Sequence, residues 1–328
     1  MKSARIVAPG RVEVDEVADL TVQPGTAVVR PLVIAIDGSD TRRVYNGAPD
    51  SYPLAPSTCA HQVVGRVEAI EYVGVKPLPF VVDEVAIVRR PGFDGLAEQI
   101  LVPIGELIHQ TLDTPLERLV LVHQLARALM AAERLRDVVG RSVAVIGQGP
   151  AGLVLDAVLR RAGARQVIGI DPVATRRDAA LRFGATAVVD PGGGAADAAA
   201  QVAAVSGAQL PDVVVEAAGS ADSINLAVAL VRAEGRLLLY GEPRAPTFPF
   251  DYGVLYEKQC AVVMSTPGTY EADGYHAYRL ATNHLARGDF AFDGLVTHRL
   301  PLDDAARAYE LSRTGDDGAC QVVIELGS

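Results

Sequence analysis

Apolar and polar residues alternate in short runs along the first 115 positions of this 328-residue chain. Gly, Pro and Asp separate the runs, and such spacing predicts short β-strands joined by turns. The expected strands are 27–36, 63–70, 84–88 and 98–102, after a strand-like opening at 1–14. We therefore expect a β-rich, barrel-like domain in the N-terminal part of the chain.

A helical pattern follows, because residues 117–136 carry apolar positions at helical spacing and predict one long helix. From residue 142, short apolar runs alternate with helical stretches, which predicts a parallel sheet with right-handed crossovers. The expected strands of this sheet are 143–146, 167–170, 187–189, 213–216, 236–241 and 260–264.

The C-terminal part returns to a mixed pattern, with a helix at 271–287, a strand at 295–300, a helix at 302–312 and a strand at 321–326. We expect this tail to rejoin the first domain. The predicted fold is therefore α/β: a discontinuous β-barrel domain of residues 1–122 and 266–328, and a doubly wound parallel-sheet domain of residues 123–265.

The most informative segment is the glycine-rich turn Gly147-Gln148-Gly149-Pro150-Ala151-Gly152. It follows a predicted strand and opens a predicted helix. Gly147 permits the tight bend, Gly149 lets the backbone approach a pyrophosphate, and Gly152 lets the helix pack on the strand. The helix N-terminus adds free N–H groups and a partial positive charge. An ordinary structural turn is the competing interpretation, but the order of strand, turn, helix and strand favours a dinucleotide site.

Asp171 ends the next predicted strand, about 20 residues after the last glycine of the turn. A carboxylate there accepts hydrogen bonds from both ribose hydroxyls of the adenosine half. It would repel a 2′-phosphate, so the sequence favours NAD(H) over NADP(H).

Composition narrows the function classes. The formal net charge is −10 without a basic run, which argues against nucleic acid or a membrane surface as partner. Three distant cysteines build neither a disulfide framework nor a zinc knuckle. The start has no signal-peptide core, and no apolar stretch is long enough to span a bilayer. A cytoplasmic protein with a small-molecule substrate is the expectation.

Several segments together resemble the medium-chain dehydrogenase/reductase family, which includes zinc alcohol and polyol dehydrogenases. Residues 37–40 (DGSD) resemble its Cys-Gly-Ser-Asp, 59–62 (CAHQ) its Gly-His-Glu, and 94–98 (DGLAE) its Gly-Gly-Phe-Ala-Glu. Residues 122–129 (VHQLARAL) resemble the Glu-Pro-Leu-Ala helix, and 295–302 (LVTHRLPL) match the C-terminal pattern. The resemblance implies a GroES-like catalytic domain and a Rossmann domain.

The resemblance also implies a catalytic divalent ion, zinc or another, held by Asp37, His61 and His123, with Gln62 where the family often has Glu. Two imidazoles and one carboxylate are a workable ligand set with one position open for substrate. They leave the ion with a net positive charge, and the absence of sulfur weakens the preference for zinc. The family's structural zinc lobe has no counterpart near residues 85–95.

Each candidate also has a simpler interpretation. Asp37 could cap the short helix starting near Ser39, although Asp40 is the better cap candidate. His61 could be a surface residue, and His123 a hydrogen-bonded core residue. Ser39 matches the family hydroxyl that passes on the alcohol proton, or it is an N-cap. Arg42 replaces a relay His and would hold a phosphate, carboxylate or sugar hydroxyl, or it is merely solvated.

In the nucleotide half, Arg176 follows Asp171 on the next helix and is expected along the adenine, or it is a solvated helix charge. Ala218 and Gly241 follow two further strands at the edge where ligands bind in doubly wound sheets. Both are candidates to border the nicotinamide ribose; the alternative is that they are ordinary loop residues.

The favoured function is an NAD-dependent dehydrogenase that interconverts a secondary alcohol of the sugar, cyclitol or polyol kind with its ketone. One alternative is a metal-free NAD(P)H reductase of a ketone or activated double bond, with His61 or His123 as acid/base. Another is a nucleotide-binding protein without catalysis. The family resemblance also predicts a homodimer or homotetramer.

Overall fold

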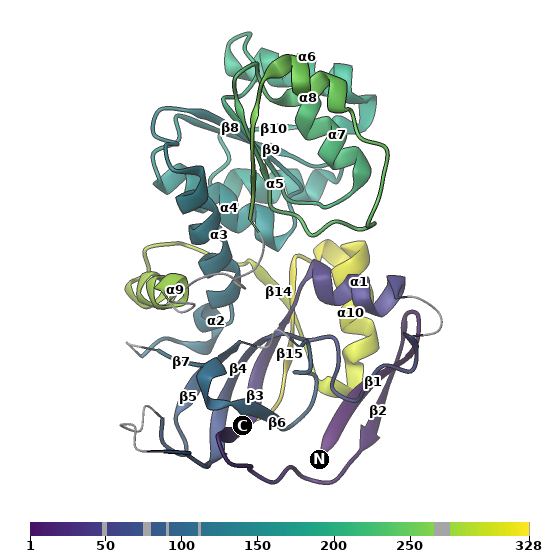
Figure 1. The fold of residues 1–328 in the computed structure, drawn as a ribbon, viewed down its shortest axis with the longest axis vertical. Coiled ribbons are helices and arrows are strands. Elements are labelled where there is room, and N and C mark those ends of the chain that lie inside the picture. The colour runs from purple at the N-terminus through teal and green to yellow at the C-terminus, as the bar shows by residue number, and fades with distance from the viewer. Residues whose placement is uncertain (48–50, 75–79, 90–91, 111–112, 266–275, 328) are drawn as a thin grey trace. The chain divides into compact units, whose positions relative to one another are not determined.

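The computed structural model describes residues 1–47, 51–74, 80–89, 92–110, 113–265 and 276–327 (Figure 1). The chain divides into two compact units. Unit 1 comprises Met1–His123 and Tyr278–Ser328, and unit 2 comprises Gln124–Ala277. A long stretch of unit 2 thus interrupts unit 1 in the sequence.

Unit 1 is built on a seven-stranded sheet. Six of its strands follow the order β14-β15-β3-β4-β5-β7, and the seventh, β6, pairs with β3; β1 and β2 form a separate hairpin. Its strands are β1 Lys2–Ala8, β2 Arg11–Glu16, β3 Thr26–Ile36, β4 Gln62–Ile70, β5 Val85–Arg89, β6 Ile100–Pro103, β7 Leu107–His109, β14 Val296–Leu300 and β15 Gln321–Glu325. Its helices are α1 Gly38–Asn46, η2 Ile104–Glu106, α2 Leu116–Leu119, η4 Leu302–Asp304, α10 Ala305–Thr314 and η5 Asp316–Gly318.

Strand β3 lies at the centre of this unit and ends at the candidate site. Six residues at its C-terminal end are buried, as expected for a strand covered on both faces. It pairs antiparallel with β4 on one side and with β15 on the other, where Val322 lies opposite Ile36. The last strand of the chain therefore borders the point at which β3 gives way to α1.

Unit 2 contains a six-stranded parallel sheet with the order β10-β9-β8-β11-β12-β13. Its strands are β8 Ser142–Ile146, β9 Gln166–Ile170, β10 Ala187–Val189, β11 Val213–Glu216, β12 Arg236–Leu239 and β13 Ala261–Met264. Its helices are α4 Pro150–Arg161, α5 Ala174–Arg182, η3 Pro191–Gly193, α6 Ala195–Ser206, α7 Ala221–Leu230 and α8 Tyr252–Lys258. Two helices, α3 Val122–Leu135 and α9 His276–Arg287, cross the unit boundaries. The predicted parallel sheet is confirmed.

Two predicted elements differ from the structure. The single helix expected at 117–136 is wrong, because a turn at Val120 and Leu121 separates α2 from α3. Both turn residues are buried, so packing in the core outweighs the continuous helical pattern. The strand expected at 236–241 ends at Leu239, since the N–H groups of Tyr240 and Gly241 both bond to the Glu216 carbonyl. Of the helix expected at 271–287, residues 271–275 lie outside the described part.

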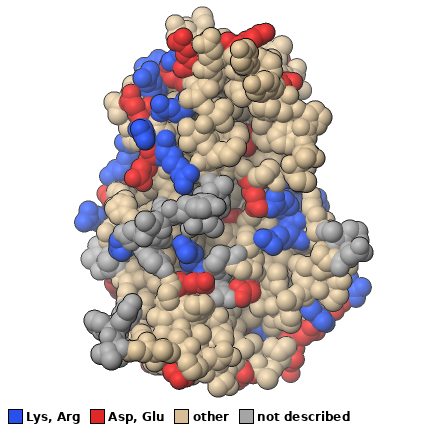
Figure 2. Space-filling view, viewed as in Figure 1, with Lys and Arg blue, Asp and Glu red and all other residues tan. Residues whose placement is uncertain are grey.

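No helix in the described part of the chain has the length and apolar character needed to cross a membrane. On the face drawn in Figure 2, basic side chains stand beside acidic ones rather than forming one continuous basic surface. This agrees with the acidic net charge of −10.

Candidate metal and nucleotide sites

The predicted ligand Asp37 lies where strand β3 ends and helix α1 begins. It is the N-cap of α1, and its Oδ1 accepts the backbone N–H groups of Ser39 at 2.8 Å and Asp40 at 3.2 Å. Asp40 Oδ2 accepts the Asp37 N–H at 3.0 Å, which completes a capping box. Asp37 does cap the helix, and the expectation that Asp40 is the better cap is wrong. Capping occupies Oδ1 and leaves Oδ2 directed elsewhere.

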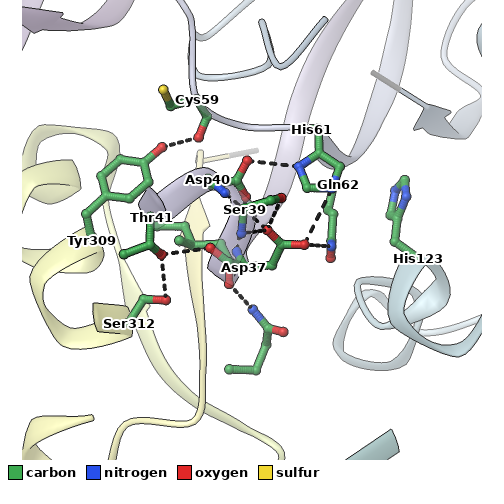
Figure 3. Close-up of polar contacts among 12 residues, drawn as sticks. Asp37, Ser39, Asp40, Thr41, Cys59, His61, Gln62, His123, Tyr309 and Ser312 are labelled. Carbon is green, nitrogen blue, oxygen red and sulfur yellow. Dashed lines mark hydrogen bonds and ion pairs between the residues drawn. The ribbon is translucent and has the colours of Figure 1, made fainter. Parts of the chain in front are cut away.

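His61 reaches the same place from the residue before strand β4 (Figure 3). Its Nδ1 lies 2.8 Å from Asp40 Oδ1, and its Nε2 lies 3.5 Å from Asp37 Oδ2. A carboxylate beside Nδ1 holds the ring proton there. The Nε2 lone pair is then available to a metal ion or to a substrate proton.

Asp37, Asp40 and His61 form a group of potential metal ligands in the described part of the chain: one donor atom from each lies within 4.8 Å of the others. Both oxygens of Asp40 are engaged, by His61 and by the Asp37 N–H. Asp37 Oδ2 and His61 Nε2 are therefore best placed to bind an ion directly. Their 3.5 Å separation fits the edge of a tetrahedron with bonds of about 2.1 Å.

The charge balance of this cluster also suits a cation. Asp40 is fully buried. Burial raises the pKa of its carboxyl to about 6, the nearby Asp37 adds to the rise, and His61 opposes it. Two carboxylates in one buried cluster repel each other, and a divalent ion would relieve that repulsion.

Two neutral side chains donate to the Asp37 carboxylate. Gln62, 1% exposed, donates from Nε2 to Oδ2 at 2.7 Å. Ser39 donates from Oγ to Oδ1 at 2.6 Å. These bonds hold the carboxylate in one orientation. Arg42 lies on the same helix and is half-buried. The catalytic roles of Ser39 and Arg42 stay predictions.

His123 stands outside the group of three. It is 2% exposed on helix α3; its Nδ1 lies 3.3 Å from the Tyr278 hydroxyl, and its Nε2 lies 3.5 Å from the Val63 carbonyl. The Tyr278 ring meets the imidazole edge to face. Figure 3 draws His123 to one side of the cluster. The structure thus brings Asp37 and His61 together, and the place of His123 in a ligand set stays a prediction.

In unit 2, the glycine turn has the geometry that a pyrophosphate cradle needs. Gly147 has a φ of +95°, which favours glycine. A Cβ on Gly152 would lie 1.9 Å from the Gly147 carbonyl oxygen, so only glycine fits there. A Cβ on Gly149 would meet nothing within 4 Å. The open space at Gly149 adjoins the first turn of α4, which starts with Pro150.

Asp171 follows strand β9 and faces this turn. Its Oδ2 accepts the Gln148 N–H at 2.8 Å, and its Oδ1 accepts the Val173 N–H at 2.9 Å. An Arg176 guanidinium nitrogen lies 3.9 Å from Oδ2. Arg176 therefore faces Asp171, and its place along the adenine stays a prediction.

The other two candidates border the same sheet edge. The strand order reverses between β8 and β11, the switch point at which parallel sheets bind ligands. A Cβ on Gly147, after β8, would lie 3.0 Å from the Ala218 Cβ. A Cβ on Gly241, after β12, would lie 2.5 Å from the Gly219 nitrogen. The structure therefore gathers Gly147, Ala218 and Gly241 at one edge.

Residues 150–283 match the family described as zinc-binding dehydrogenase. Among curated proteins, the chain is 29% identical over 239 residues to D-xylulose reductase A of Aspergillus niger, covering 71% of this chain and 64% of that protein. It is 27% identical over 323 residues to L-threonine 3-dehydrogenase of Caldanaerobacter subterraneus, covering 90% and 91%. The alcohol dehydrogenase of Thermus sp. ATN1 superposes over 100% of both chains with a TM-score of 0.85 and 25% identity.

Residues 150–283 therefore carry a zinc-binding dehydrogenase domain, and the chain as a whole is similar to medium-chain dehydrogenases/reductases. The predicted family and α/β fold class are confirmed. The chain spans 64% of the length of the D-xylulose reductase that it matches. One of the departures from the pattern that the resemblance predicts is a carboxylate, Asp37, where that pattern has Cys.

Proposed function

We propose that the protein is an NAD-dependent dehydrogenase that interconverts a secondary alcohol and its ketone by hydride transfer. Two relatives bear the names D-xylulose reductase and L-threonine 3-dehydrogenase, and both names describe chemistry at a secondary alcohol carbon. A sugar, cyclitol or related polyol is the proposed substrate class. The observation that carries the proposal is the pairing of Asp37 Oδ2 with His61 Nε2 at 3.5 Å in a chain that also has a dinucleotide turn.

The residues around the turn fit NAD. The pyrophosphate would lie over Gly149 and the N–H groups of the first turn of α4. Asp171 carries an acceptor for the adenosine ribose hydroxyls, because each carboxylate oxygen has a second lone pair beside its backbone bond. The open space at Gly149 supports this placement. Ala218 and Gly241 are proposed to border the nicotinamide ribose.

Asp37 and His61 fit a divalent ion, with Asp40 holding the imidazole. A bound ion would lower the pKa of the substrate alcohol and stabilise the alkoxide. Ser39 is the proposed relay for the alcohol proton: its oxygen accepts that proton as its own hydrogen passes to Asp37 Oδ1, the atom to which it already donates. Arg42 and Gln62 are proposed to favour a hydroxylated substrate. The donor set lacks sulfur, so we expect Mn²⁺ or Co²⁺ to compete with Zn²⁺ better than at a thiolate site.

One observation favours a second, metal-free mechanism. Ser39 and Asp40 backbone N–H groups, the Ser39 hydroxyl and the Gln62 amide already donate to the Asp37 carboxylate. These hydrogen bonds can satisfy the carboxylate without a metal ion. The Asp40–His61 pair is then itself a general acid/base, with His61 Nε2 as the reacting atom.

The metal content of the purified protein distinguishes the metal-assisted mechanism from the metal-free one. The substitution Asp37→Asn is the test, because Asn caps helices as well as Asp. It removes the charge and the second acceptor oxygen, to which Gln62 donates and which the ion would use. We expect about one ion per chain in wild type purified without chelator, and a loss of ion and of NAD-dependent turnover in Asp37→Asn. Full turnover on polyols after chelation, with an unchanged Asp37→Asn variant, would instead support the metal-free reaction. Nucleotide affinity without any turnover would support a binding protein.

We also propose that the chain forms a homodimer or homotetramer through the edge of the unit 2 sheet. Strand β13 ends the sheet order, and Val262 and Met264 on it are 42% and 62% exposed. An unpaired edge with apolar side chains is a template for pairing with a second copy. Size-exclusion chromatography with light scattering is the test: Val262→Lys should shift the protein toward monomer.

A further inference from the structure

A buried tyrosine from the C-terminal part of the chain holds the segment that presents His61. Tyr309 lies on α10 and is 0% exposed. Its hydroxyl donates to the carbonyl of Cys59, two residues before His61 (Figure 3). Cys59 has a φ of +82°, a conformation that non-glycine residues adopt only when the surroundings hold it. On the other side of the same residue, the Cys59 N–H bonds to the Phe93 carbonyl.

A buried amide does the same for the segment that presents Asp37. Gln321 opens β15 and is 0% exposed. Its Nε2 donates to the Ile36 carbonyl at 2.7 Å, one residue before Asp37. Its Oε1 is buried without a partner in the described part of the chain. A buried oxygen without a partner destabilises the fold, so the benefit of Gln321 over an apolar residue lies in its N–H donors.

Both contacts cross the core of unit 1 and end within two residues of a proposed ligand. Sequence separations of 250 and 285 residues lie between the partners. Neither Tyr309 nor Gln321 belongs to the cluster itself. Because the backbone sets where each ligand side chain starts, the two bonds together control the gap between Asp37 Oδ2 and His61 Nε2.

We propose that Tyr309 and Gln321 are positioning residues that keep the Asp37 and His61 donor atoms at a separation that one divalent ion can bridge. The inference rests on the metal site proposed above. In this proposal the C-terminal segment contributes more than a helix and strands to unit 1, because its side chains also set the geometry of the Asp37–His61 ligand pair.

The test uses Co²⁺ as the probe, added to the full-length metal-free protein. Its dissociation constant is measured by competition with a chromogenic chelator, and its d–d absorption reports the ligand geometry. We expect Tyr309→Phe and Gln321→Met each to weaken Co²⁺ binding by up to about tenfold and to alter the absorption band. Tenfold is the lower end of the loss for groups bonded directly to metal ligands, and these two act through the adjoining backbone. Tyr45→Phe is the control. Tyr45 lies near the C-terminal end of α1, and its hydroxyl bonds to Glu310 at an exposed part of α10, not to the backbone beside Asp37 or His61.

Thermal unfolding of the metal-free variants separates positioning from general stability. A structural role alone predicts a lower Tm with an unchanged Co²⁺ spectrum and affinity at 25 °C, and that result overturns the inference while leaving the proposed function intact. If wild type binds no Co²⁺, the proposed metal site and this inference both fall. If Tyr309→Phe does not fold, the inference is tested with Gln321→Met, which alters a different contact, by the same measurements of Co²⁺ affinity, Co²⁺ absorption and Tm.

Discussion

Asp40 lies between the two proposed ligands: its Oδ1 is 2.8 Å from His61 Nδ1, and its Oδ2 accepts the Asp37 N–H at 3.0 Å. One buried carboxylate therefore closes the capping box of α1 and orients the imidazole. Asp40 therefore serves both the start of the helix and the proposed metal site. A change at Asp40 should accordingly alter the site without touching either ligand.

The first prediction concerns Asp40→Asn. An amide can accept at one of its two contacts only, so either the His61 bond or the Asp37 bond is lost. We expect metal affinity to fall by about 10–100-fold and the ring proton of His61 to lose its preference for Nδ1. Chelator competition and ¹⁵N NMR of the imidazole measure these effects. Asp304→Asn is the control, because that exposed carboxylate makes no side-chain bond to its helix; an equal loss in both variants would contradict the prediction.

The second prediction contrasts two glycines of the nucleotide turn. Gly149→Ala should fold normally, because its Cβ meets nothing within 4 Å. Its NADH affinity should fall by about tenfold or more, about 1.4 kcal/mol, because the methyl group occupies the space through which the pyrophosphate approaches the backbone. Gly152→Ala should destabilise the protein by about 1–3 kcal/mol, because its Cβ would lie 1.9 Å from the Gly147 oxygen. Urea unfolding and fluorescence titration measure both. Normal NADH binding by Gly149→Ala would place the nucleotide elsewhere.

The parallel sheet was predictable because its strands are short apolar runs, of which the central ones, β8 and β11, are buried throughout. Strands β10 and β11 have the bounds expected from the sequence, Ala187–Val189 and Val213–Glu216. The break between α2 and α3 was not predictable, since Val120 and Leu121 continue the apolar pattern and only their packing makes a turn there.

The candidate site was predictable in part. Family resemblance paired Asp37 with His61, and the structure places their side chains together. The sequence pattern indicates only a helix cap at Asp40, although its position three residues after Asp37 is the capping-box spacing. Its second contact, to His61, depends on how loop and helix meet in space. The His123 ring contacts Tyr278, which is 155 residues away in the sequence. A local sequence pattern cannot predict a contact between residues so far apart.

The third prediction concerns the choice of coenzyme. Arg176 lies 3.9 Å from the Asp171 carboxylate. In Asp171→Ala the guanidinium loses this partner and can attract a 2′-phosphate, while the ribose hydroxyls lose their acceptor. We expect weaker NADH binding and stronger NADPH binding, measured as the ratio of their dissociation constants. Adding Arg176→Ala should remove the gain for NADPH; a double variant that keeps it would contradict the role of Arg176.

The fourth prediction concerns pH and a carboxyl group that no proposed step uses. Asp156 lies on α4 and is 0% exposed, and neither of its oxygens has a hydrogen-bond partner in the described part of the chain. Burial raises the pKa of this carboxyl well above its usual value, and the nearby Gln148 amide lowers that pKa by a smaller amount. The folded protein therefore keeps a proton on Asp156 at pH values where the unfolded chain releases it.

The sign of the pH effect follows from this difference. Below about pH 4 the Asp156 carboxyl is protonated in both the folded and the unfolded state, so its ionisation does not change the free energy of unfolding. As the pH rises toward the folded pKa, the unfolded chain is favoured by about 1.4 kcal/mol per pH unit. Asn has no proton to lose, so Asp156→Asn should match wild type near pH 4 and become progressively more stable than wild type above it. Urea unfolding from pH 4 to pH 8 measures the difference, with exposed Asp178→Asn as the control. A constant difference across that range would mean that Asp156 ionises in the folded protein as it does in the unfolded chain.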